Sequence, residues 1–146
     1  MLDHSPVLSV GLPLIASFVC PLIGRWKERA CYGWVIVTFF LSFLASVYTL
    51  LRVIESGTVR YRLGGWAPPF GIEYVIDHLN GMMLVVVSAI SLLTAVYSGK
   101  SVERELPGRV VYFFTLFLLQ VTGFLGIVIT GDLFNLYVFL EIASLA

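Results

Sequence analysis

The chain has 146 residues, of which 59% are hydrophobic and only 12% are charged, and its mean hydropathy is +0.96. Soluble domains average about 45–50% apolar and about 25% charged residues. A chain of this size has too little interior to bury the surplus, so the composition excludes an ordinary soluble domain and predicts a covering of lipid. Nine basic and nine acidic residues give zero formal net charge, so no basic stripe indicates a nucleic-acid partner.

The amino end of the chain carries the first apolar segment, over about residues 5–24. The residues before it, Met1-Leu2-Asp3-His4, lack the basic region that opens a signal peptide, and no Ala-x-Ala cleavage site follows. We therefore expect a retained membrane span rather than a cleaved leader.

Three further uncharged stretches are long enough to cross a bilayer. A spanning helix needs about 20 apolar residues, because the hydrocarbon core is about 30 Å thick and a helix rises about 1.5 Å per residue. The stretches lie at about residues 31–51, 79–98 and 110–130, and a fifth apolar segment occupies residues 133–146. The predicted fold is an all-α integral membrane bundle, a single domain with four complete transmembrane helices plus the start of a fifth.

The fifth segment is short for a span. Its 14 residues reach about 21 Å, which is less than a bilayer crossing. Carbonyl groups at its end would lie unsatisfied in hydrocarbon, at a cost of several kcal/mol each. We therefore expect that the natural polypeptide continues or that a partner covers this end.

Residues 55–78, between the second and third spans, form the one sizeable extramembrane segment. Val59-Arg60-Tyr61-Arg62-Leu63 alternates apolar and polar residues as a short strand does. The glycines and prolines of residues 64–71 break any helix and supply turns. We expect a small hairpin or ordered loop at the outer face, with Trp66 and Phe70 in the headgroup layer.

Basic residues are distributed unequally between the two ends of the predicted helices. One end carries six, namely Arg25, Lys27, Arg29, Lys100, Arg104 and Arg109. The other end carries three, namely Arg52, Arg60 and Arg62. Because basic loops remain in the cytoplasm, the pattern favours a multi-pass protein with its N-terminus outside. A prokaryotic cytoplasmic membrane is the expected location.

The two cysteines, Cys20 and Cys31, have neither C-x-x-C spacing nor a nearby histidine, so neither a metal site nor a redox pair is expected. Both lie near the same membrane face, where a disulfide is geometrically feasible. We expect free thiols packed among the helices instead.

Glu141 is the one acidic residue well within a predicted span. Nine steps of about 1.5 Å from Asp132 place it about 13 Å deep, close to the midplane. A carboxylate there costs about 2.5–3.5 kcal/mol on insertion scales, and such residues face a bundle interior or water and mark proton or ion pathways. We interpret Glu141 as part of a proton path. The alternatives are a protonated acid in one interhelical hydrogen bond, or a carboxylate in a wet crevice left by the chain end.

Polar residues at membrane depth are candidate partners of Glu141. Tyr137 lies one helical turn earlier and offers a hydroxyl, although packing is the more ordinary role of an aromatic residue there. Gln120 and Thr122 of the fourth segment offer further polar groups, and interhelical hydrogen bonding without transport is their alternative role.

Small residues mark expected helix contacts. Gly123 and Gly126 allow close approach in the fourth span, and Ser88, Ser91 and Ala95 form a similar seam in the third.

Three polar residues lie at the outer ends of spans. Asp77 and His78 precede the third span, and Asp132 precedes the fifth. Capping is the favoured role, because an aspartate accepts hydrogen bonds from the first free amides of a helix. A proton antenna formed by Asp77 and His78 is the alternative.

Motifs of bond-breaking chemistry are missing from the sequence. No Ser-His-Asp arrangement, metal-ligand cluster, phosphate loop or cofactor motif occurs. The sequence therefore predicts no catalytic residue, metal or cofactor in this chain and leaves open a place in a redox-driven ion-pumping complex.

Two motifs resemble a known family, the antiporter-like membrane subunits. Residues 65–72 (GWAPPFGI) with residues 77–81 (DHLNG) are similar to the loop before the family's third helix, and residues 131–142 (GDLFNLYVFLEI) are similar to its fifth helix. The family includes the D-type subunit of Mrp-type multisubunit Na⁺/H⁺ antiporters and related subunits of complex I and of membrane-bound hydrogenases. The resemblance covers nearly the whole chain, as an N-terminal portion, and the two motifs fit the Mrp-type branch best.

The resemblance implies that Glu141 matches the family's fifth-helix glutamate, which pairs with a lysine on a later helix and modulates proton transfer along buried polar groups. In this chain the only lysines, Lys27 and Lys100, lie in loops. The predicted function is a subunit or subunit fragment of a cation/proton antiporter module, standing alone or within a respiratory or hydrogenase complex. Its expected partners are other membrane subunits, the lipid bilayer and protons, with Na⁺ left open. A structural assembly subunit without transport is the main alternative, and an unrelated homo-oligomeric transporter is a third.

Overall fold

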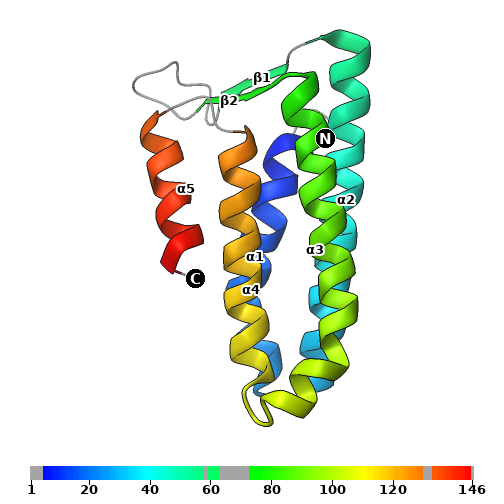
Figure 1. Cartoon of the computed structure of the whole chain (residues 1–146), viewed down its shortest axis with the longest axis vertical. Coiled ribbons are helices and arrows are strands. Elements are labelled where there is room, and N and C mark those ends of the chain that lie inside the picture. Colours follow the sequence, from blue (N-terminus) through cyan, green and yellow to red (C-terminus); the bar gives the residue numbers. More distant parts are fainter. Residues whose placement is uncertain (1–4, 58, 63–72, 130–132, 146) are drawn as a thin grey trace.

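The computed structural model describes residues 5–57, 59–62, 73–129 and 133–145. Over these residues, helices run along one long axis and a two-stranded hairpin lies at one end of the bundle (Figure 1). The elements are α1 (Ser5–Gly24), α2 (Glu28–Ser56), β1 (Val59–Arg62), β2 (Glu73–Ile76), α3 (His78–Glu105), α4 (Val110–Ile129) and α5 (Leu133–Leu145).

Three of the described helices are long and apolar enough to cross a membrane, over Arg29–Ser56, His78–Glu105 and Val110–Ile129. The described apolar parts of α1 and α5 are shorter, at Leu8–Gly24 and Leu136–Leu145. The chain is therefore a nearly all-helical, multi-pass membrane protein, as its composition predicts. Four complete spans remain a prediction.

Two helices are longer than the apolar stretches that predict them. α2 extends from Glu28 to Ser56, and α3 continues to Glu105, seven residues beyond the expected end. A hydropathy criterion stops at the first charged residues, whereas helical hydrogen bonding continues through them once the chain has left the hydrocarbon. At about 1.5 Å per residue, the added turns of α3 extend the bundle by about 10 Å.

The segment between α2 and α3 forms the expected hairpin. β1 and β2 pair antiparallel, with Val59 opposite Ile76 and Arg62 opposite Glu73. The Ile76 side chain is fully buried beneath the hairpin and belongs to the hydrophobic core. Trp66 and Phe70, expected in the headgroup layer, lie outside the described residues.

A hydrogen bond between helices compensates for a proline in α1. Pro13 has no N–H, so the carbonyl of Ser9 loses its helical donor. The Ser42 hydroxyl of α2 donates to that carbonyl at 2.8 Å, and both serines are fully buried. An unmatched carbonyl in hydrocarbon costs several kcal/mol, so this bond joins α1 to α2 where α1 is weakest.

A seam of small residues on α3 is buried, as expected. Ser88, Ser91 and Ala95 are at most 7% exposed, and Gly99 continues the same face. The ring of Tyr32 on α2 lies against Gly99, and its hydroxyl donates to the Val96 carbonyl at 3.1 Å. The packing interpretation of this seam is confirmed.

α4 contacts α1, α3 and α5, and two of its glycines set its distance from α5. A Cβ atom on Gly126 would overlap the Phe139 ring, and one on Gly123 would lie 2.8 Å from the backbone nitrogen of Ala143. Real Cβ atoms do not approach neighbours that closely, so only glycine permits this contact. The interpretation of Gly123 and Gly126 as packing residues is confirmed.

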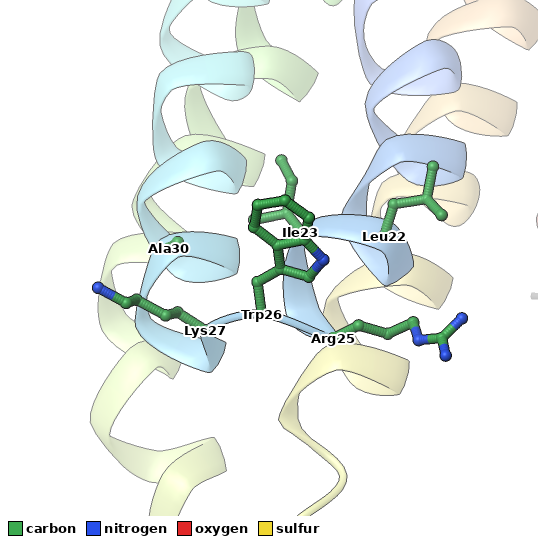
Figure 2. A pocket seen from close by; sticks show the side chains of 6 residues that line it. All are labelled: Leu22, Ile23, Arg25, Trp26, Lys27 and Ala30. Carbon is green, nitrogen blue, oxygen red and sulfur yellow. The ribbon is translucent and has the colours of Figure 1, made fainter.

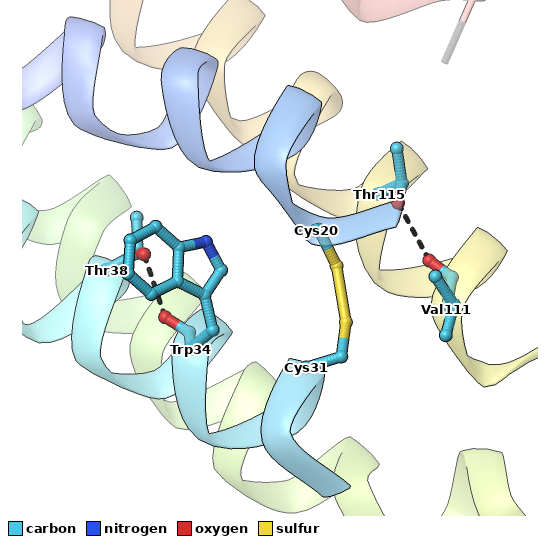
Figure 3. Close-up of a disulfide and its surroundings, with 6 residues drawn as sticks. All are labelled: Cys20, Cys31, Trp34, Thr38, Val111 and Thr115. Atoms are coloured by element: carbon cyan, nitrogen blue, oxygen red, sulfur yellow. Dashed lines mark hydrogen bonds between the residues drawn. A yellow bond between two sulfur atoms is a disulfide. The ribbon is translucent and has the colours of Figure 1, made fainter. Parts of the chain in front are cut away.

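Cys20 and Cys31 form a disulfide, with their Cα atoms 5.7 Å apart (Figure 3). The expectation of free thiols is therefore wrong. α1 ends at Gly24 and α2 begins at Glu28, so the chain reverses within a few residues and brings the two buried cysteines together. Helical periodicity alone does not reveal how a turn rotates two helices relative to each other.

The glycine contact predicts a site-specific packing defect. We expect Gly126→Val to lower the free energy of unfolding by about 1–3 kcal/mol, because the added side chain collides with Phe139. Gly33→Val is the matched control, since no atom lies within 4 Å of a Cβ at that helical glycine. Denaturant titration of both variants in detergent measures the difference, and equal effects would contradict the contact.

The disulfide predicts the thiol chemistry of the unfolded chain. Maleimide added to the chain denatured without reductant should label neither cysteine, and after reduction it should label both. Cys31→Ser is the control, because it frees the Cys20 thiol for labelling without reductant. Labelling of the unreduced parent chain would disprove the bond.

Candidate functional site

Glu141 lies on α5, the short apolar helix that packs against α4. Along α5, Glu141 lies between two residues that contact α4. Phe139 contacts Gly126, and Ala143 contacts Gly123. Figure 1 shows the carboxyl end of α5 about halfway along the bundle. The backbone packing of α4 against α5 therefore sets the depth of this carboxylate.

Tyr137 is the side-chain partner of Glu141. The Tyr137 hydroxyl donates to Oε1 of Glu141 at 3.2 Å, within one turn of α5. The Tyr137 side chain is 61% exposed, so its contact is with the carboxylate rather than with a packed core. The Ser144 hydroxyl donates to the backbone carbonyl of Glu141 at 3.1 Å, which satisfies a carbonyl near the end of the helix.

The carboxylate faces away from α4. Phe139, which contacts α4, is 7% exposed, whereas Tyr137, Glu141 and Ser144 are exposed and share the opposite face at helical spacing. Within the described part of the chain, no hydrogen bond or ion pair from another helix reaches Glu141. This face of α5 is thus open to whatever adjoins the chain in the membrane.

The structure separates the polar candidates on α4 from Glu141. Thr122 is fully buried, and its hydroxyl donates to the Leu118 carbonyl of its own helix at 2.8 Å. Gln120 is half-buried, two residues closer to the amino end of α4. Among the described contacts neither residue is bonded to the Glu141 carboxylate.

At the hairpin end of the bundle, Asp77 is the N-cap of α3. Its carboxylate accepts a hydrogen bond from the backbone N–H of Asn80 at 2.8 Å. This is the geometry of capping, which stabilises a helix by typically about 1 kcal/mol. His78 is the exposed first residue of the helix, and Asp132 lies outside the described residues.

Sequence reasoning missed a pocket at the turn between α1 and α2. It is lined by Leu22, Ile23, Arg25, Trp26, Lys27 and Ala30. The basic residues of this turn were interpreted only as determinants of orientation. A tryptophan placed between an arginine and a lysine, directly after an apolar span, was the signal that pointed to it.

The arrangement supports proton chemistry more readily than bond breaking. A carboxylate with a phenol hydroxyl at 3.2 Å can hold a proton and exchange it through hydrogen-bonded groups. No group of three or more His, Cys, Asp or Glu side chains suited to a metal ion occurs among the residues that the structure describes.

Sequence comparisons find relatives that are several times longer than this chain, although no family model matches. The chain is 40% identical over 147 residues to NADH-quinone oxidoreductase subunit N of Desulforudis audaxviator, covering 100% of this chain and 29% of that protein. It is 36% identical over 150 residues to a probable K⁺/H⁺ antiporter subunit of the D type from Rhizobium meliloti, covering 96% and 26%. It is 30% identical over 147 residues to the D-type Na⁺/H⁺ antiporter subunit of Alkalihalophilus pseudofirmus, covering 99% and 29%.

Solved structures with the same fold belong to large membrane complexes. A chain of the membrane-bound sulfane sulfur reductase, an archaeal respiratory membrane complex, superposes with a TM-score of 0.88 at 29% identity, covering 96% of this chain and 28% of that one. A chain of the Mrp complex from Dietzia sp. superposes with a TM-score of 0.81 at 26% identity, covering 99% and 26%.

The resemblance stated from the two motifs is confirmed. Relatives named as D-type antiporter subunits match, and so does a relative named NADH-quinone oxidoreductase subunit N. The identity to this subunit N, 40%, is higher than the 36% and 30% to the two D-type subunits, whereas the two motifs favoured the Mrp-type branch. The chain spans less than a third of the length of these relatives. It is thus homologous to part of the antiporter-like subunits of multisubunit membrane complexes.

Proposed function

We propose that this chain contributes Glu141 as a proton-carrying carboxyl to a cation/proton antiporter module within a multisubunit membrane complex. The observation that supports the proposal is the position of Glu141, within the apolar helix α5 and on a face that no other described element covers. The relatives, which are antiporter and respiratory-complex subunits, support the same assignment.

The physical argument starts from the cost of a charge in hydrocarbon. An ionised carboxylate at this depth costs several kcal/mol unless another helix or water solvates it. Within the described chain it receives one side-chain hydrogen bond, from Tyr137. Neighbouring helices in the complex must therefore cover the open face of α5, and a polar or basic group there would let the carboxyl release and regain its proton.

The exchanged cation is part of the proposal. The names of the relatives include both a K⁺/H⁺ and a Na⁺/H⁺ antiporter subunit. We therefore propose exchange of protons with a monovalent cation, with Na⁺ as the first to test. Tyr137 is proposed to support the carboxyl directly, and Gln120 and Thr122 would act only through water or a rearranged helix.

A structural assembly role is the second candidate, and one observation favours it. The other described charged residues lie in loops or near helix ends, so this chain does not by itself present the series of buried groups that a proton path requires. In that case the exposed face of α5 serves only as an interface.

Replacement of the carboxyl distinguishes the two candidates. In the assembled complex, Glu141→Gln should lower proton-coupled cation flux by about 10²-fold or more, because an amide of the same shape carries no exchangeable acid proton. Asp77→Asn is the matched control, since that carboxylate caps a helix at the exposed end of the bundle. Flux across vesicle membranes measures the effect, and unchanged flux with intact assembly would favour the structural role.

For orientation, we propose a cell-membrane location with the N-terminus outside. Six basic residues at one end against three at the other support it. The Cys20–Cys31 disulfide lies at the basic end, and disulfides persist mainly in oxidising compartments, which argues for the opposite orientation. We give the charge distribution more weight, because both cysteines are fully buried and so shielded from reducing thiols.

Cysteine accessibility tests this orientation. In a chain with Cys20→Ser and Cys31→Ser, a membrane-impermeant maleimide should label Lys100→Cys only after cell lysis, because the exposed Lys100 would face the cytoplasm. Glu55→Cys, exposed at the opposite end of the bundle, should be labelled in intact cells. The reverse pattern would place the N-terminus inside.

A further inference from the structure

A cavity of about 760 Å³ lies at the turn between α1 and α2 (Figure 2). Its volume falls within the range of about 300–1,000 Å³ that is typical of small-molecule sites. Leu22 and Ile23 from the end of α1, Ala30 from the start of α2, and the indole of Trp26 give it apolar walls. The cavity is distant from Glu141 and independent of the proposed proton chemistry.

Two cations lie beside these apolar walls. Figure 2 shows the side chains of Arg25 and Lys27 extending to opposite sides of the turn, with the Trp26 indole standing between them. Both cations are exposed, and neither forms an ion pair with any side chain that the structure describes. Residues 25–29 contain three basic residues and one acidic residue, so the turn is positively charged.

The position of the turn matches the headgroup layer of a bilayer. α1 ends at Gly24, so the turn follows directly after the apolar helix, and Leu22 is 63% exposed on the membrane side of it. Trp26 is 90% exposed, which is unfavourable in bulk water but favourable at a membrane interface, where tryptophans concentrate. Apolar walls therefore lie on the hydrocarbon side of the cavity, and the cations lie on the aqueous side.

We propose that this cavity binds an anionic phospholipid. The acyl chain would lie against Leu22, Ile23 and the Trp26 indole, and the phosphate would lie within reach of Arg25 or Lys27. The argument rests on charge complementarity, because exposed cations at the rim of an apolar cavity, unpaired among the described side chains, match the amphipathic division of such a lipid. Basic pockets beside transmembrane helices recognise anionic headgroups in this way.

Quenching of Trp26 fluorescence by brominated lipids tests the proposal. The full chain, with Trp34→Phe and Trp66→Phe so that Trp26 alone is observed, is reconstituted into vesicles containing brominated phosphatidylglycerol or brominated phosphatidylcholine. We expect relative binding to favour phosphatidylglycerol by between about fivefold and about 25-fold, because each of the two basic residues strengthens binding of a nearby anionic lipid by about fivefold. The preference should weaken at high salt, which screens exposed charges.

Matched charge removal distinguishes a built site from general attraction. Arg25→Gln with Lys27→Gln should abolish the preference, whereas Lys100→Gln with Arg104→Gln, which removes two exposed charges at the same end of the bundle, should preserve it. Equal quenching by the two lipids, or equal loss of preference in both double variants, would overturn the proposal.

Two further outcomes also decide the question. Absence of quenching by either lipid would show that no acyl chain lies close to the Trp26 indole, and it would overturn the lipid assignment. Native mass spectrometry of the unsubstituted chain, released from mixed vesicles, counts the phosphatidylglycerol that it retains. This measurement decides the question even where a charge variant fails to fold, because retention no greater than that of phosphatidylcholine would contradict the proposal.

Discussion

The need to satisfy every backbone polar group in hydrocarbon shapes this bundle more than any single side chain does. The Ser42 hydroxyl donates to the Ser9 carbonyl that Pro13 leaves without a donor, and so joins α1 to α2. Other buried hydroxyls, such as those of Thr38, Ser46 and Thr122, donate to carbonyls of their own helices. The buried serines and threonines named here are therefore occupied structurally and offer no free polar group to Glu141.

The position of Glu141 depends on backbone contact rather than on polar attraction. Gly123 and Gly126 let α5 lie directly on α4, and this contact fixes both the depth of the carboxylate and the face on which it emerges. Because the carboxylate points away from α4, the described bundle presents it outward with Tyr137 as its hydrogen-bond partner. Any proton function is thus shared with whatever covers α5 in the assembled membrane complex.

The basic end of the bundle combines a covalent link with the pocket proposed to bind lipid. The Cys20–Cys31 disulfide holds α1 and α2 together on either side of the turn that carries Arg25, Trp26 and Lys27. Because the disulfide fixes the turn, the indole and the two cations keep the same position relative to the ends of α1 and α2. The proposed orientation of the chain and the proposed lipid site therefore involve the same few residues.

The sequence by itself determined where the apolar helices lie, that a hairpin separates the second from the third, that Asp77 would cap α3, and that Glu141 is an anomaly at membrane depth. These features follow from hydropathy and residue spacing, which depend only on residues that are close together along the chain. The tertiary structure alone decided that Cys20 pairs with Cys31, that Ser42 meets Ser9, and that Tyr137 rather than Gln120 or Thr122 reaches the carboxylate. Those pairings depend on how each helix is rotated and how tightly each turn reverses the chain, and hydropathy contains no information about either.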